Sequence, residues 1–119
     1  SAQDLPRADA ALAPGLHLVR EGNQVTAHVS ASAASQNLAG YWAVLQDGLS
    51  SPVTRGENSG TTLRNDHVVR LYQPVADWQG AQTFTLVLPP ADPVHPRRVA
   101  FVIAAAADLR PVQALSLGC

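Results

Sequence analysis

One stretch of the sequence, RGENSGTTLRNDHVVR at residues 55–70, gathers side chains that could bind an anion or a partner protein. Arg55, Arg64 and Arg70 flank an expected loop, and their forked guanidinium groups suit carboxylates. Glu57 and Asp66 lie close enough in sequence to neutralise two of these arginines. We therefore favour an internal polar network and keep an anion or small-ligand site as the alternative.

The same stretch also has an ordinary structural explanation. The glycines around GENSG suit a loop that visits positive φ, and Asn65 and Asp66 can cap a turn through their side-chain oxygens. Arg70 is expected at a sheet edge or in a pair, because an unpaired buried guanidinium is too costly. The residues predicted to form an interface or ligand loop are Arg55, Glu57, Asn58, Arg64, Asp66, His67 and Arg70.

Catalytic and metal-binding patterns are weak elsewhere. No serine lies in a G-x-S-x-G turn, and His17, His28, His67 and His95 lack metal-ligand spacing. His17 and His28 fall on neighbouring strands of an expected hairpin, where two surface imidazoles are a commoner outcome than a ligand pair. We predict no catalytic residue, no metal and no cofactor, with an enzyme site at residues 55–70 as the competing interpretation.

The amino-acid composition indicates a single globular domain and argues against several classes of function. With 119 residues, 46% hydrophobic and only 14% charged, the chain has the make-up of one ordered domain. Eight arginines and no lysine against nine acids give a net charge of −1, which argues against nucleic acid binding. No apolar run is long enough to span a bilayer, and no signal peptide is expected in this chain. Cys119, the single cysteine, cannot close an internal disulfide.

Period-two alternation predicts strands over most of the chain. LHLVR and QVTAHVS, either side of EGN, predict a hairpin, and GYWAVLQ, apolar on both faces, predicts a central strand. Residues 61–72 are ambiguous between helix and strand; β-branched residues favour a strand that ends at or before Pro74. QTFTLVL adds a strand, and RRVAFVIA with PVQALSL predicts a closing hairpin with Asp108 in its loop.

About seven such runs, separated by turn residues, predict an all-β fold: an antiparallel two-sheet sandwich of the immunoglobulin/fibronectin-III-like kind. Residues 1–15 are expected to form a linker or N-terminal arm, with a disordered terminus as the alternative, and residues 16–119 the sandwich. The predicted core is Val25, Val29, Trp42, Val44, Phe84, Leu86, Phe101 and Ile103.

The RGENSGTTLRNDHVVR stretch, the W-x-G at residues 78–80 and the closing RRVAFVI and PVQALSL runs resemble a secreted, thioredoxin-like bacterial family of unknown function, DUF1223. The pattern G-E-N-x-G-x-x-L followed by H-V-V-R carries the resemblance, which covers roughly residues 40–117. It implies a C-terminal domain of an exported, periplasmic protein whose N-terminal domain is thioredoxin-like. The chain has no C-x-x-C or C-x-x-S, so the family's thiol chemistry transfers to no residue here.

Three functions follow as hypotheses. The first is a non-catalytic accessory module that contacts the thioredoxin-like domain of its own protein or another partner protein. The second is the anion, small-ligand or enzyme site at residues 55–70. The third is an assembly module that pairs through an exposed sheet edge.

Overall fold

The computed structural model describes residues 13–32, 36–46, 52–53, 61–62, 68–90, 94 and 96–118, which form nine strands and no helix. The strands are β1 (Leu16–Glu21), β2 (Gln24–Val29), β3 (Leu38–Gln46), β4 (Pro52–Val53), β5 (Thr61–Thr62), β6 (Val68–Trp78), β7 (Gln82–Val87), β8 (Arg97–Ala105) and β9 (Pro111–Gly118). None of the described elements is a helix that could cross a membrane.

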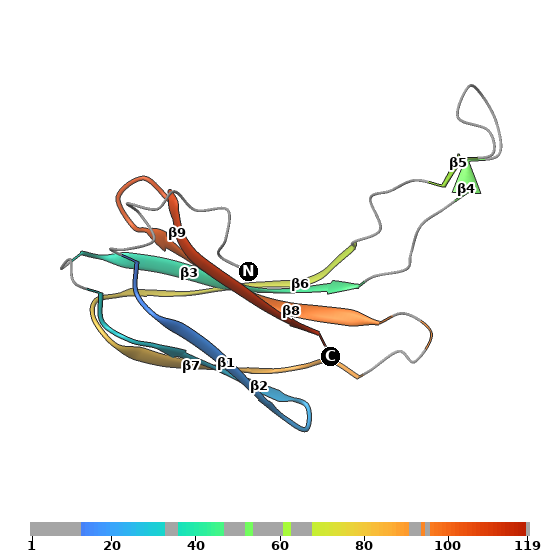
Figure 1. The fold of residues 1–119 in the computed structure, drawn as a ribbon, viewed down its shortest axis with the longest axis horizontal. Coiled ribbons are helices and arrows are strands. Elements are labelled where there is room, and N and C mark those ends of the chain that lie inside the picture. Colours follow the sequence, from blue (N-terminus) through green and yellow to red (C-terminus); the bar gives the residue numbers. More distant parts are fainter. Residues whose placement is uncertain are drawn as a thin grey trace.

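Seven of these strands make two antiparallel sheets, in the orders β1-β2-β7 and β6-β3-β8-β9, and β4 pairs with β5. Figure 1 shows the two larger sheets as stacked layers. The predicted antiparallel sandwich of about seven strands is confirmed. The fourth major strand, β6, joins the sheet of β3, whereas in constant-type immunoglobulin domains the fourth strand joins the first sheet.

The first hairpin forms as its alternation predicts. Its register runs from Leu16 opposite Val29 to Glu21 opposite Gln24. The two-residue loop between the strands starts with Gly22, at a φ of 63°, which glycine adopts without steric cost. The apolar residues of β2 all point into the sandwich, so the pattern that predicted the strand also determines which of its faces is buried.

An aromatic cluster joins the two layers. The ring of Phe101 on β8 lies 4.8 Å from Trp42 on β3 and 5.2 Å from Phe84 on β7, measured between ring centres. Trp78, the last residue of β6, packs edge-on against Phe84 at 4.7 Å. Edge-to-face and offset contacts of this kind add to the free energy gained from burial alone.

The core prediction is confirmed. Seven of the eight predicted residues are buried, and Phe84 is partly buried against the same cluster. The sequence prediction omitted further core members, which are Leu18, Ala27, Leu38, Trp78, Leu88, Val99, Ala105 and Val112.

The prediction for residues 61–72 is partly wrong. The strand interpretation holds for the described residues, but β6 does not end at Pro74; it continues to Trp78. The physical reason is its position: among the described strands β6 has only β3 as a neighbour, and a strand at a sheet edge tolerates the missing N–H of proline. Two register shifts against β3 also mark β6 as irregular.

Phe101→Ala is expected to lower the free energy of unfolding by about 3–5 kcal/mol, since it opens a cavity where both sheets meet. Phe101→Leu, which keeps most of the apolar volume, is the matched control and should cost clearly less. Urea denaturation measures both changes. A loss of less than about 1 kcal/mol in the alanine variant would contradict the central position of this ring.

Candidate functional site

Most of the predicted interface loop lies outside the described residues. Six of its seven members, Arg55, Glu57, Asn58, Arg64, Asp66 and His67, belong to that part, and so does the proposed polar network with Glu57 and Asp66. Arg70 is described: it lies on β6, at the edge of the four-stranded sheet, and is exposed.

Arg70 is the extra residue of a β-bulge. Val44 of β3 pairs with Leu71 and Leu45 pairs with Val69, so Arg70 has no residue paired with it on β3. A bulge re-aims the side chain it carries, and here Arg70 lines a pocket of about 240 Å³ together with Arg97 and the buried Gln46. The bulge therefore brings two guanidinium groups to one pocket.

Arg97 is held at the wall of that pocket by backbone oxygens. It is only 8% exposed, and its NH1 group donates to the carbonyl oxygens of Pro89 and, at 3.2 Å, of Pro90. These carbonyl oxygens accept from NH1 but leave the positive charge of the guanidinium in place. Together with Arg70, this places two positively charged side chains at the pocket, and guanidinium groups are suited to donate to carboxylates and phosphates.

A second candidate lies on the outer face of the four-stranded sheet. The rings of Tyr41 on β3 and Tyr72 on β6 pack 5.0 Å apart at 46°. They line a pocket of about 250 Å³. We call this region the tyrosine surface; its principal residues are Tyr41, Tyr72, Pro74, Asp77, Val102 and Leu109. Tyr72 is 62% exposed and Leu109 is 67% exposed, so large apolar groups face solvent here.

Leu109 adopts an unusual backbone conformation beside this pocket. Its φ is 60°, in the left-handed region that costs a residue with a Cβ roughly 1–2 kcal/mol. The turn is closed by bonds from Leu109 N to Ala105 O at 2.8 Å and from Ala105 N to Arg110 O at 2.9 Å. Asp108 lies in this loop, as predicted, and its Oδ1 accepts from Arg110 N at 3.0 Å. Strain of this kind gathers at functional sites.

A side chain has little room at Gly40, where the tyrosine surface meets the core. A Cβ on Gly40 would lie 3.0 Å from the carbonyl oxygen of Val102 and 3.1 Å from the ring of Trp78. The indole of Trp78 therefore packs over Gly40, with its Nε1 donating to Gly80 O at 3.1 Å. The W-x-G motif thus has a structural role: it places a core ring and closes the turn into β7.

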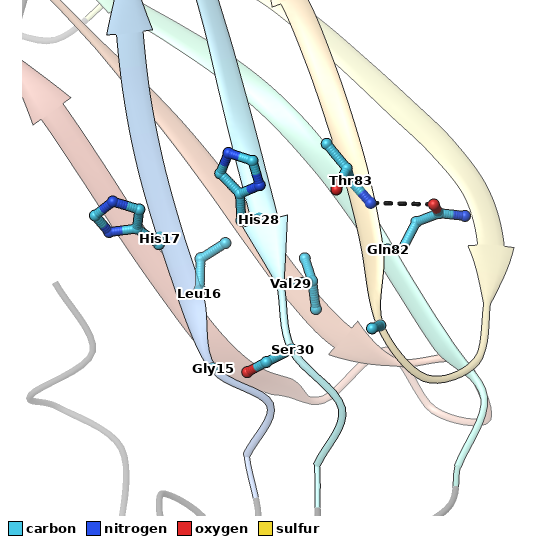
Figure 2. A pocket seen from close by; sticks show the side chains of 9 residues that line it. Gly15, Leu16, His17, His28, Val29, Ser30, Gln82 and Thr83 are labelled. Carbon is cyan, nitrogen blue, oxygen red and sulfur yellow. Dashed lines mark hydrogen bonds between the residues drawn. The ribbon is translucent and has the colours of Figure 1, made fainter.

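A third candidate lies on the outer face of the three-stranded sheet (Figure 2). His17 on β1 stands directly opposite His28 on β2, and their ring centres lie 6.3 Å apart. Thr83 on β7 is opposite His28 on its other side. The three side chains line a wide, open depression of about 690 Å³. Among the described residues no group of three or more His, Cys, Asp or Glu side chains is arranged to hold a metal ion.

Sequence reasoning did not identify the tyrosine surface. Tyr41 and Tyr72 are 31 positions apart, and the sequence predicts only that each belongs to a strand. The pairing of β3 with β6 brings their rings together. Leu109 carried a signal that could have been noticed. It follows Asp108 in a hairpin loop, at a point where glycine or asparagine is usual.

Comparison with protein families places the chain. The family described as "Protein of unknown function (DUF1223)" matches residues 2–105. The chain belongs to this family. The match includes the first forty residues, which we had expected to contribute little, and it ends at the last residue of β8, before Leu109 and β9. No curated protein and no solved structure matches significantly.

Leu109→Asn is expected to keep or raise the melting temperature even though it replaces an apolar side chain with a polar one of similar size, because asparagine tolerates the left-handed conformation. Leu109→Val should lower it, since a β-branched residue fits that conformation worst. Differential scanning calorimetry compares the two variants. Equal melting temperatures for both variants would show that the left-handed backbone conformation of residue 109 does not lower the stability of the fold.

Proposed function

We propose that this member of the DUF1223 family is a non-catalytic accessory module of an exported, thioredoxin-like protein. In this proposal it works in the periplasm or outside the cell, and it contacts the thioredoxin-like domain of the same protein through the tyrosine surface. The described part of the chain is a β-sandwich, and sandwiches commonly serve as contact modules on cell-surface and exported proteins.

The observation that carries this proposal is the exposure of Tyr72 and Leu109 around a formed pocket. Tyrosine is enriched at protein interfaces and among the residues that dominate their binding free energy. Surface apolar residues scattered singly need no explanation, but Tyr41, Tyr72 and Leu109 line one pocket. The strained backbone of Leu109 adds support, because a sequence optimised only for folding would carry glycine or asparagine there.

The sequence supports the non-catalytic part of the proposal. With Cys119 as its single cysteine, the chain has no pair of thiols to cycle between dithiol and disulfide. Any dithiol chemistry of the whole protein would then belong to another segment. The predicted loop residues remain candidates for a contact in this proposal, namely Arg55, Glu57, Asn58, Arg64, Asp66, His67 and Arg70. Of these, Arg70 lies on β6, two residues before Tyr72.

Edge pairing is the less favoured route to a contact. The exposed edge of β6 carries Pro74 and two register shifts against β3, which are features that discourage strand addition. A side-chain contact on the face of the sheet is therefore preferred to an assembly through its edge.

Tyr72→Ala is expected to weaken binding between this chain and the separately produced upstream domain of the full-length protein at least tenfold, the effect of losing an interface tyrosine worth about 1.4 kcal/mol or more. Isothermal titration calorimetry measures the affinity. Val87→Ala is the matched control, because Val87 is an equally exposed apolar residue (64%) on a strand of the other sheet. Equal losses in the two variants, or no binding by the parent chain, would overturn the proposal.

Anion binding at the Arg70 and Arg97 pocket is the second candidate. The observation in its favour is that two guanidinium groups line one small pocket whose other described walls are uncharged. The ligand would be a carboxylate or phosphate, either free or on a partner's side chain.

Arg70→Gln should reduce the affinity for inorganic phosphate at least fivefold, because it removes one of the two positive charges at the pocket. Arg20→Gln is the matched control: it removes the same charge from the first hairpin, where Arg20 Nε donates to Gly22 O at 2.8 Å. Titration followed by nuclear magnetic resonance measures both affinities. If the two substitutions lower the phosphate affinity equally, phosphate responds only to the overall charge of the protein and the pocket is not a specific anion site.

A further inference from the structure

The first hairpin places two imidazoles side by side on a rigid surface. His17 and His28 occupy opposite positions of β1 and β2, and their rings are 6.3 Å apart between centres with 31° between the planes. Figure 2 shows both rings on the outer face of the three-stranded sheet. From this juxtaposition we propose that His17 and His28 together bind a divalent transition-metal ion.

The separation of the rings fits a shared ion. With a metal–nitrogen bond of about 2.0–2.1 Å and each ring centre about 1.15 Å behind its nitrogen, two imidazoles on one ion have centres about 5 Å apart at a tetrahedral angle and about 6.4 Å apart when opposite each other. The observed 6.3 Å lies at the upper end of this interval, close to the value for ligands opposite each other. Both side chains are exposed, so small rotations about their own bonds can close the rings further without any change in the backbone.

The positions of the two ligands are set by the fold. β2 is the central strand of its sheet, paired with β1 on one side and β7 on the other. The residues next to His28, Ala27 and Val29, are buried in the core, and this holds the histidine on the outer face. Two ligands whose backbones are already in place lose less conformational entropy on binding an ion than two ligands on free loops.

The surroundings suit a cation with an incomplete protein ligand set. None of the other described residues that line the depression carries a charge, so no cation repels the ion. Thr83, opposite His28, offers a hydroxyl oxygen on the same surface, and Ser30 lines the same depression. Water would fill the remaining positions, which makes the site open, unlike the closed four-ligand sites that stabilise small domains.

Ligand type identifies the class of metal. Imidazole nitrogen suits copper, nickel and zinc, and the order of affinity for such sites places Cu²⁺ above Ni²⁺ and Zn²⁺. Calcium and magnesium prefer oxygen ligands and are not expected to compete. The sequence had favoured two independent surface imidazoles; the opposed register of the hairpin supports a shared ion instead. This site lies on the other layer of the sandwich from the tyrosine surface, so it does not depend on the function proposed above.

The test is a Cu²⁺ titration by isothermal calorimetry of the whole chain carrying Cys119→Ser, which removes a competing thiol ligand. One ion per chain is expected. His17→Gln and His28→Gln should each weaken binding at least tenfold, whereas the matched control His95→Gln, which removes the same kind of side chain outside the pair, should leave it unchanged. If His95→Gln weakens binding as much as either variant of the pair, the proposal is overturned.

Electron paramagnetic resonance provides a second measurement of the same samples. The Cu²⁺ spectrum of the parent chain should show coupling to two imidazole nitrogens, and that of either single variant coupling to one. A parent spectrum with one imidazole, or a variant spectrum with two, would overturn the proposal. Because both histidines are exposed, the variants should keep the strand-rich circular dichroism spectrum of the parent.

A third measurement concerns stability. An ion bound to both strands of the folded hairpin, and to neither strand alone, should raise the melting temperature by several degrees at saturation. Zn²⁺ serves as the probe here because it does not oxidise the protein. The rise should vanish in the double variant H17Q/H28Q, and a rise that persists there would place the ion elsewhere.

Discussion

The contact of Phe101 with rings from both layers is the interaction on which the rest of the molecule depends. Phe101 belongs to the four-stranded sheet, and it touches Trp42 within that sheet and Phe84 across the interface. Only 5% of the residues are aromatic, and Trp42, Trp78 and Phe101 lie in a core cluster whose other buried members are aliphatic. Because the inward-facing side chains are buried between the two sheets, the outward-facing positions can hold polar and exposed groups.

The outer faces differ in what they offer. The three-stranded sheet presents a polar row in which His17, His28 and Thr83 stand opposite one another. The four-stranded sheet presents the tyrosine surface. This division follows from period-two alternation, because each strand that gives one residue to the core gives the next to solvent. Two different kinds of recognition can therefore coexist on a domain with a single core.

β6 is the element that departs most from regular geometry. As an edge strand it can hold Pro74. The bulge residue Arg70 lines a pocket together with Arg97, and Tyr72, two residues later, belongs to the tyrosine surface. β-Bulges are over-represented at sheet edges and next to active sites. The strand thus carries both Arg70, one of the predicted site residues, and Tyr72 of the surface for which we propose a contact.

The sequence by itself determined the strands and the inward-facing residues, because alternation and turn chemistry are local properties: the first hairpin, the closing hairpin with Asp108 and the core around Trp42 followed from them. It could not determine that β6 passes Pro74, since the tolerance of an edge strand for proline depends on which neighbours it lacks. Nor could it pair Tyr41 with Tyr72. Those relations depend on strand order and register, which arise only when distant segments pack together and bury their apolar faces.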